Sequence, residues 1–340
     1  MTVSIIIPMY NVEPYIIRCV DSVLRQTHRQ LEVILIDDCS PDNSMEIARK
    51  HIEASASSRD LKFIYIRHEK NRGLSAARNS GIGAATGEYV YFLDGDDEIT
   101  EDCMETLTRE AINHPEVDIV CGNCIEPYEG KRRVYHIDEY RYYDKNDQIR
   151  YCLFCPQQSM PIIACNKLVS LQFIKDNDLY FGEGLVHEDI LWTFQVVTKM
   201  KQFAMLPHGT YIYHLNHDSI NFTTSEVKTS QSMSYSLGVI TDSIDEPCGL
   251  LGLYKYLLRW FNIYKHLSWR ESQPTSIKFC KSLWNYGARD AAVATWLYFR
   301  LYKIPPLRRI EWRLTSYIRK KYLQQDHLAK QKINDKYNRH

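Results

Sequence analysis

Short runs of apolar residues alternate with amphipathic stretches through the first 125 positions of the chain. An apolar run that is too short for a helix predicts a buried strand, whereas apolar residues recurring every three or four positions predict a helix. Strands are predicted at 3–8, 31–36, 61–66 and 89–93, and helices at 15–26, 44–54 and 74–85. This regular alternation is typical of an α/β fold, in which helices cover a parallel sheet.

The order is lost at residues 126–160, which are rich in Tyr, Arg and Asp and predict a long loop. Helical spacing returns at 168–177 and 190–200, and a short strand is predicted at 210–213. From about residue 231 onward the pattern is helical, with aromatic residues between basic ones. We therefore expect an α/β domain over residues 1–225 and a helical extension over residues 226–340.

The charges are unevenly distributed along the chain. The 340 residues include 42 basic and 42 acidic side chains, but residues 1–250 carry a net charge of −14 and residues 251–340 carry +14. Five of the six Trp residues lie in this basic tail. Helices of this composition are typical of segments that bind a membrane surface, and packing on the acidic domain or on a second subunit is the alternative. Nucleic acid is not an expected partner, because large apolar residues interrupt the basic face.

Three features of the sequence predict a cytoplasmic protein. The first strand begins without a basic leader, and no run of about 18 apolar residues is long enough to span a bilayer. The ten Cys residues, in the absence of an export signal, predict reduced thiols. Together with the basic tail, these features place the protein at the cytoplasmic face of a membrane.

Carboxylates follow two of the predicted strands directly. The second strand leads into Asp37 and Asp38, and the fourth leads into Asp94, Asp96 and Asp97. Ligands of open parallel sheets bind beyond the carboxyl ends of the strands, where these side chains are expected to meet. The first strand lacks the glycine-rich turn that cradles a pyrophosphate in dinucleotide enzymes. A diphosphate bound beside so many carboxylates requires a divalent cation between them, so a metal-bridged nucleoside diphosphate is the expected ligand.

Five segments of the chain resemble, in order and spacing, the motifs of glycosyltransferase family 2. They are Val3–Glu13, Ile36–Ser44, Asn71–Asn79, Phe92–Asp97 and Glu188–Asp189. The resemblance covers about residues 1–220 and leaves the tail unexplained. It implies the GT-A fold, which is a Rossmann-like, mostly parallel central sheet with flanking helices, and the activity of an inverting sugar transferase.

The resemblance also implies a donor site. Tyr10 would stack on the nucleotide base while Asp38 accepts a hydrogen bond from a ring N–H, a pairing that suits uracil. Pro8, Asn11 and Glu13 would shape the same pocket. A UDP-sugar is therefore the expected donor.

Further residues are implied to bind the diphosphate and its cation. Arg78 would offset phosphate charge, with a local surface ion pair as the alternative. Asp94 would approach the ribose, and Asp96 would hold Mn²⁺ or Mg²⁺. His214 would be a third metal ligand, with a structural role as the alternative.

Asp189 resembles the general base of the family. It would take the proton from an acceptor hydroxyl as that oxygen attacks the anomeric carbon. For the neighbouring Glu188 we expect a structural role at the start of a helix. The predicted reaction moves a sugar from a nucleotide-diphosphate sugar to a glycan or lipid-linked acceptor in polysaccharide biosynthesis.

Two other functions are considered. A nucleotidyltransferase has a similar sheet, but it normally needs a glycine-rich loop with Lys or Arg after the first strand, which this sequence lacks. A membrane-peripheral binding or assembly protein would keep the fold without turnover, but it would have no chemical need for converging carboxylates.

Overall fold

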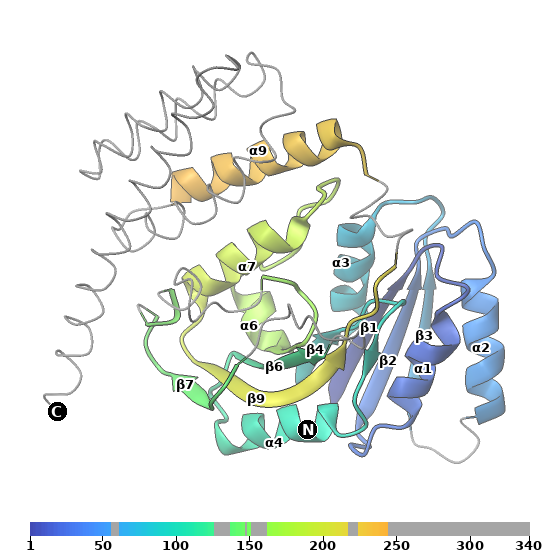
Figure 1. Ribbon diagram of the computed structural model, residues 1–340, viewed down its shortest axis with the longest axis horizontal. Helices are drawn as coiled ribbons and strands as arrows, with labels where there is room; N and C mark the ends of the chain where they lie inside the picture. The colour runs from blue at the N-terminus through green and yellow to red at the C-terminus, as the bar shows by residue number, and fades with distance from the viewer. Residues whose placement is uncertain (56–60, 126–136, 147, 151–161, 217–223, 244–340) are drawn as a thin grey trace, which may run out of the picture. The chain divides into compact units, whose positions relative to one another are not determined.

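The computed structural model describes residues 1–55, 61–125, 137–146, 148–150, 162–216 and 224–243 (Figure 1). The chain divides into two compact units, Met1–Leu153 with Gln157–Thr223 and Phe154–Pro156 with Thr224–His340. The domain boundary placed at residue 225 stays a prediction.

Nine strands of the described residues form one mixed sheet, and its first half is parallel. The parallel strands are β1 (Val3–Met9), β2 (Leu31–Asp37), β3 (Lys62–Arg67) and β4 (Tyr89–Phe92). They lie in the order β3-β2-β1-β4, so the chain moves outward from β1 to β3 and then returns across β1 to β4. This reversal places a topological switch point at the carboxyl ends of β1 and β4, where ligands bind in sheets of this kind.

The second half of the sheet is mixed in direction. It consists of β5 (Glu98–Ile99), β6 (Ile119–Ile125), β7 (Arg141–Tyr143), β8 (Lys167–Ser170) and β9 (Phe203–Ile212). β8 runs antiparallel between β4 and β6, whereas β6 and β9 are parallel to each other. β5 and β7 each pair antiparallel with β9. The prediction of a mostly parallel sheet therefore holds only for the half built from β1 to β4.

The helix predicted over 168–177 is wrong at its start. Residues through Ser170 form β8, and the helix α6 (Leu171–Asp176) begins only after them, with Ser170 Oγ accepting from the backbone N–H of Phe173. Lys167, Leu168 and Val169 are all buried between the neighbouring strands. A short strand that is buried on both faces shows no polar alternation, so periodicity could not separate it from a helix. The strand predicted at 210–213 likewise begins earlier, at Phe203.

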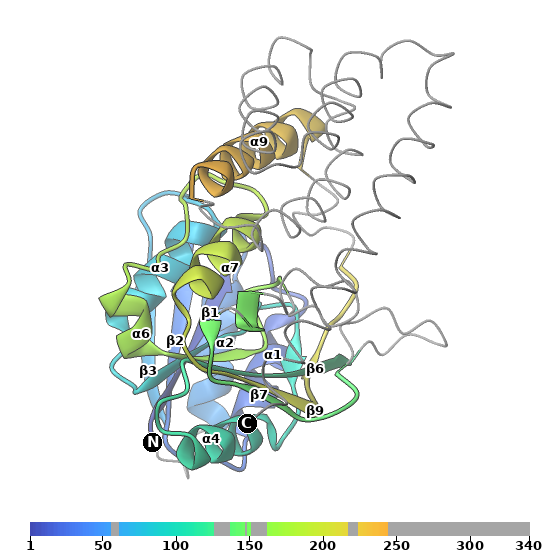
Figure 2. The ribbon, with the colours of Figure 1, turned by 90° about the vertical axis from the view of Figure 1, so that its left-hand side faces the viewer.

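The remaining helices of the first unit cover the two faces of the sheet. They are α1 (Ile16–Leu24), α2 (Ser44–Ser55), α3 (Leu74–Ala84), α4 (Cys103–Asn113) and α7 (Glu188–Lys199). α1 packs on α2, and α3 packs on β1 and β2 from the opposite face, as Figures 1 and 2 show. Right-handed crossovers produce this arrangement, because the chain direction across the sheet reverses after β3.

Gly81 determines how closely α3 approaches the sheet. A Cβ built at this position would lie 2.4 Å from Ile6 Cγ2, in the centre of β1. Ile6 is fully buried, and its neighbours on β1 are apolar and buried too. The absence of a side chain at Gly81 therefore allows the helix backbone to lie against the core.

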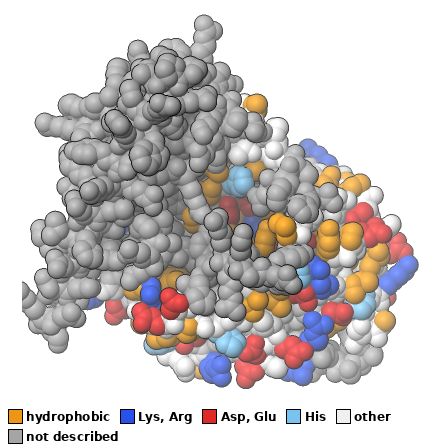
Figure 3. Space-filling view, viewed as in Figure 1, with side chains coloured by type: hydrophobic (Ala, Val, Ile, Leu, Met, Phe, Trp, Pro, Cys, Tyr) orange, Lys and Arg blue, Asp and Glu red, His pale blue; other side chains and the backbone are white. Residues whose placement is uncertain are grey.

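Figure 3 shows how charged side chains are distributed on one face of the described residues. On the described part of the face shown in Figure 3, acidic and basic side chains are interspersed, with hydrophobic side chains between them. That face therefore lacks a continuous acidic patch.

The second unit contributes one helix to the described residues, α9 (Glu226–Ser243). Its presence agrees with the helical pattern expected from about residue 231. The rest of the predicted basic extension, 244–340, lies outside the described residues. Within the part of the chain that is described, no helix is long and apolar enough to cross a membrane.

Candidate active site

The acidic turn, defined as residues 94–97, follows β4 at the switch point of the sheet. The backbone N–H of Asp97 donates to the carbonyl of Asp94, which closes the turn. A Cβ added to Gly95 would lie 3.2 Å from the carbonyl oxygen of Pro8, at the end of β1. The turn therefore lies directly against the carboxyl end of the neighbouring parallel strand.

The carboxylates of the acidic turn disfavour each other's ionisation. Burial raises the pKa of Asp96, and the charge of Asp94 raises it further. Burial, together with the charges of Asp96 and Asp94, raises the pKa of Asp97 to about 8. Concentrated negative charge of this kind is favourable when a cation binds beside it.

The end of β9 is tied to the acidic turn through side chains. Asp97 accepts hydrogen bonds from the hydroxyl of Tyr211 at 2.6 Å and from the backbone N–H of His214 at 2.8 Å. Asn216 Nδ2 donates to Asp96 Oδ2 at 2.9 Å. Two carboxylates of the acidic turn are thus oriented by β9 and by the residues that follow it.

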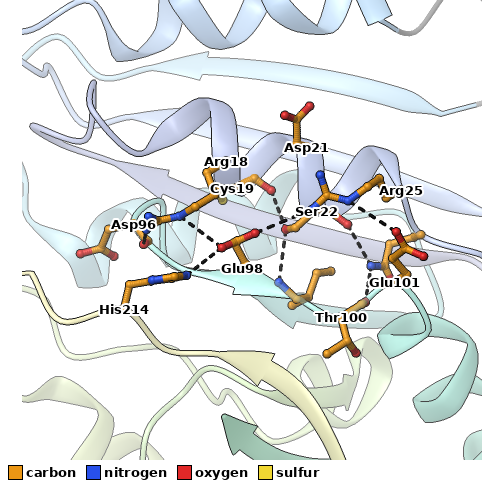
Figure 4. A network of polar contacts seen from close by, with 12 residues as sticks. Arg18, Cys19, Asp21, Ser22, Arg25, Asp96, Glu98, Thr100, Glu101 and His214 are labelled. Atoms are coloured by element: carbon orange, nitrogen blue, oxygen red, sulfur yellow. Dashed lines mark hydrogen bonds and ion pairs between the residues drawn. The ribbon is translucent and has the colours of Figure 1, made fainter. Parts of the chain in front are cut away.

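Arg18 and Glu98 hold the same turn from α1 and β5 (Figure 4). Arg18 Nη2 donates to the carbonyl oxygen of Asp96 at 2.6 Å, and Arg18 Nε lies 3.3 Å from Glu98 Oε1. His214 Nε2 lies 2.7 Å from that same oxygen of Glu98. In Figure 4 the carboxylate of Asp96 points away from Glu98. Because His214 Nε2 contacts Glu98, this nitrogen is directed away from the carboxylate of Asp96.

The residues of the acidic turn fit a divalent cation in part. Asp94 and Asp96 supply the hard oxygen ligands that Mg²⁺ and Mn²⁺ prefer, and such sites commonly combine one or two carboxylates with phosphate oxygens and water. Within the described residues, no group of three or more His, Cys, Asp and Glu side chains stands ready to hold a metal. Metal ligation by His214 stays a prediction.

The residues predicted to contact the nucleotide base follow β1. Tyr10 is 49% exposed, so its ring is free to receive a flat ligand. Asn11 has a φ of +57°, a left-handed conformation that Asn tolerates better than most residues, and its N–H donates to Ser40 Oγ. Glu13 accepts from the backbone N–H of Asn43 at 2.8 Å, next to the start of α2. Pro8 to Glu13 therefore lie against the segment that follows β2.

Asp38 is a buried carboxylate whose orientation is set by three donors. Oδ1 is 2.6 Å from His68 Nδ1 and accepts from the backbone N–H of Arg72, and Oδ2 accepts from the N–H of Gly73 at 2.6 Å. A carboxylate offers about four acceptor positions. Among the described residues, one position, on Oδ2, therefore remains for a further donor.

His68 is a site residue that sequence reasoning missed. It directly follows β3 and is 8% exposed, and its Nε2 lies 2.8 Å from Ser80 Oγ on α3. The signal was present in the sequence, because Asp38 and Asp94 are predicted from their positions just beyond the ends of parallel strands. His68 holds the same position beyond the end of the third strand.

Arg78 lies in the middle of α3 and bridges two carboxylates. Nη2 lies 2.8 Å from Asp94 Oδ1, and Nη1 donates to Glu188 Oε1 at the start of α7. The guanidinium carbon is 5.3 Å from the ring centroid of Phe181. The alternative prediction, a local ion pair at the surface, is therefore wrong, because Arg78 is only 3% exposed.

Asp189 lies in the first turn of α7 and is half-buried. Burial and the charge of Glu188 raise the pKa of Asp189 to about 7, against the opposing effects of Arg78 and Lys167 and of the backbone N–H of Ile190. A carboxylate with a pKa near the working pH can accept a proton from a hydroxyl and release it again. The environment of Asp189 therefore suits a general base.

The family described as "Glycosyl transferase family 2" matches residues 4–174, which is half of the chain. The chain belongs to glycosyltransferase family 2. Membership confirms the resemblance drawn from the five motifs. The matched residues contain the acidic turn together with Asp38 and Arg78, while Asp189 follows beyond the matched range.

A bacterial glycosyltransferase matches about two thirds of this chain. The uncharacterized glycosyltransferase EpsJ of Bacillus subtilis is 35% identical over 223 residues, which are 64% of this chain and 62% of EpsJ. The chain thus spans less than two thirds of the length of this relative.

Two solved structures share the fold of this family 2 protein. Staphylococcus aureus TarS 1–349 in complex with UDP-GlcNAc has a TM-score of 0.68 and 22% identity, over 92% of this chain and 90% of that chain. The mannosyltransferase PcManGT from Pyrobaculum calidifontis, in complex with GDP-Man and Mn²⁺, has a TM-score of 0.54 and 18% identity, over 93% and 84%. These likenesses confirm the GT-A fold.

Proposed function

We propose that this protein is a metal-dependent, inverting glycosyltransferase. It transfers a sugar from a UDP-sugar to a hydroxyl group of a glycan or lipid-linked acceptor in polysaccharide biosynthesis. The observation that carries this proposal is the contact of Arg78 with both Asp94 and Glu188, because it joins the acidic turn to the helix that bears Asp189. Donor-binding groups and a base are thereby linked on the edge of the sheet where ligands bind.

The nucleotide is recognised through its base. The open acceptor position of Asp38 suits a ring N–H of the kind that uracil carries, and cytosine would present an acceptor there instead. Tyr10 is exposed enough to stack on the ring. The complex of TarS with UDP-GlcNAc supports UDP-GlcNAc as the first donor to test.

Asp96 is the residue proposed to hold the cation, and Asp94, proposed to approach the ribose, lies beside it in the acidic turn. When bound, Mn²⁺ or Mg²⁺ would offset the negative charge that grows on the leaving diphosphate. The raised pKa of Asp96, caused by burial and by Asp94, supports a cation in this place. PcManGT, whose complex contains Mn²⁺, supports manganese as the metal to try first.

Asp189 removes the proton from the acceptor hydroxyl. The acceptor oxygen forms a bond to the anomeric carbon of the sugar as the bond from that carbon to the diphosphate oxygen breaks. The electron pair of the broken bond leaves with UDP, and the proton remains on Asp189. A single displacement of this kind inverts the configuration of the anomeric carbon.

The proposed acceptor is a hydroxyl group of a glycan or of a lipid-linked molecule. Membrane contact through the basic tail would bring the protein to a lipid-linked acceptor, but residues 251–340 lie outside the described residues. Sedimentation with vesicles containing anionic lipid tests this contact on the full chain. Release at high salt is expected, because the attraction of Lys and Arg to anionic lipid is screened.

Calorimetric titration with UDP and GDP, each with and without Mn²⁺, tests the donor site. UDP is expected to bind tightly only with Mn²⁺, and the titration with GDP shows whether guanine, which also carries a ring N–H, is accepted. Transfer is then followed with UDP-GlcNAc, and the anomeric configuration of the product is read by NMR. Absence of binding by either nucleotide, or a product of retained configuration, would contradict the proposal.

A further inference from the structure

Arg78 is the buried link between two parts of the site that are far apart in the sequence. Its side chain leaves the middle of α3, and its terminal nitrogens reach Asp94 at the end of β4 and Glu188 at the start of α7. The ring of Phe181 covers the guanidinium. Arg78 and Glu188 are 3% and 6% exposed. The contact is therefore shielded from water and from salt.

The contact with Glu188 lies in the first turn of α7. His187 precedes the helix with a φ of +57° and provides no side-chain hydrogen bond to cap it. Further along the helix, Trp192 and Thr193 donate to backbone carbonyls of neighbouring segments. Among the described residues, the first turn of α7 makes a side-chain hydrogen bond to another element through Glu188, which accepts from Arg78 on α3. Asp189 is the next residue, so its position follows that of Glu188.

The chemistry of arginine suits a bridge between two carboxylates. Its planar guanidinium presents donors in fixed directions, so Nη1 and Nη2 serve different partners at the same time. A lysine would keep the charge but offers a single ammonium, which cannot reproduce both contacts with the same geometry. The remaining nitrogen, Nε, is buried and has no hydrogen-bond partner within the described residues. If Arg78 contacts a phosphate directly, as the family resemblance implies, Nε is the nitrogen left to donate to it.

We propose that Arg78 is a positioning residue that fixes the first turn of α7, and with it Asp189, against the acidic turn. The role rests on the proposed function, because it assumes that Asp189 acts on an acceptor beside a donor bound at the acidic turn. Arg78 then acts through Glu188 and Asp94 on the geometry of the reaction. Its loss would leave the donor bound and the base displaced.

The test compares Arg78→Lys, Glu188→Gln and the double variant with the wild type. Arg49→Lys is the matched control, because Arg49 forms an exposed ion pair with Glu53 on α2, where the same exchange changes no site contact. For each protein we measure the affinity for UDP with Mn²⁺, kcat and KM with UDP-GlcNAc, and amide hydrogen exchange in α7. Circular dichroism shows whether each variant is folded.

Arg78→Lys and Glu188→Gln are each expected to lower kcat on the order of 100-fold, since small displacements of a reacting group cost about this much. The affinity for UDP should stay within about threefold of the wild type, and the double variant should be no worse than the poorer single variant, because both remove one shared contact. Amide exchange in α7 should be faster in both single variants. Arg49→Lys should match the wild type.

Other outcomes would overturn the proposal. If Arg78→Lys weakens UDP binding by about tenfold or more and leaves kcat intact, Arg78 contacts the phosphate instead. If the losses in the double variant multiply, the two residues act separately. If Arg78→Lys does not fold, Glu188→Gln still decides, and full kcat in that variant overturns the role. If the wild type shows no transfer at all, the proposed function fails. Amide exchange in α7 then still tests the role of Arg78: unchanged exchange in the single variants refutes it, and faster exchange supports it.

Discussion

His68 Nδ1 lies 2.6 Å from Oδ1 of Asp38, the carboxylate proposed to contact the nucleotide base. Ser80 holds the other ring nitrogen of His68 from α3. The carboxylate of Asp38 is thus oriented before any ligand binds, so nucleotide binding need not pay for ordering it.

We expect His68→Phe to weaken UDP binding about tenfold in the presence of Mn²⁺, since a hydrogen bond to a charged group contributes about 1.5–3 kcal/mol. Calorimetry measures the change. His51→Gln is the matched control, because His51 forms a similar pair with Asp21 at 2.6 Å on the α1–α2 side of the sheet. Equal effects of the two substitutions would show that His68 has no specific part in nucleotide recognition.

Transfer should depend on pH through Asp189. Its raised pKa of about 7, caused by burial and by Glu188, means that the carboxyl is protonated below that pH and cannot accept a proton. The value of kcat/KM should therefore fall as pH is lowered through about 7 and reach a plateau above about 8. A profile that is flat between pH 5.5 and 8.5 would contradict the assignment of Asp189 as the base.

Asp189→Asn should remove the proton acceptor and leave the donor site. Activity is expected to fall by about 10²- to 10⁴-fold, the usual contribution of a general base, while the affinity for UDP with Mn²⁺ stays near that of the wild type. Parallel loss of UDP affinity would place Asp189 in donor binding instead.

Asp96→Asn should abolish the dependence of UDP binding on Mn²⁺. The substitution removes the charge of the carboxylate proposed to hold the cation, so affinity with Mn²⁺ should drop to the level measured without it. Glu101→Gln is the control, because that carboxylate is 70% exposed and its nearest charged partner is Arg25. Wild-type affinity with Mn²⁺ in Asp96→Asn would show that the metal binds elsewhere.

Two glycines on α3 should respond in opposite ways to the same substitution. Gly81→Ala places a methyl group 2.4 Å from Ile6 Cγ2 and should lower the free energy of unfolding by about 1–3 kcal/mol through overpacking. Gly83→Ala meets no atom within 4 Å, and it should raise the same free energy by up to about 1 kcal/mol through helix propensity. Urea denaturation measures both. A loss of stability in both variants would mean that the packing of α3 on Ile6 is not the cause.

Much of the parallel half of the fold follows from local pattern. Strands of four to seven apolar residues and helices with apolar spacing are recognisable one by one, and a parallel sheet brings their carboxyl ends together. Asp38, Asp94 and Asp96 were therefore placed at a common edge from the sequence. The family motifs then supplied their expected roles and added Asp189.

Long-range packing decided the rest. β8 is a strand because it pairs with β4 along one edge and with β6 along the other, which no window of nearby residues reveals. The contact of Arg78 with Glu188 joins residues 110 positions apart, and that of His68 with Asp38 joins residues 30 apart. Side-chain partners at such separations depend on which elements pack together, so the contacts that orient the site are decided only in the folded chain.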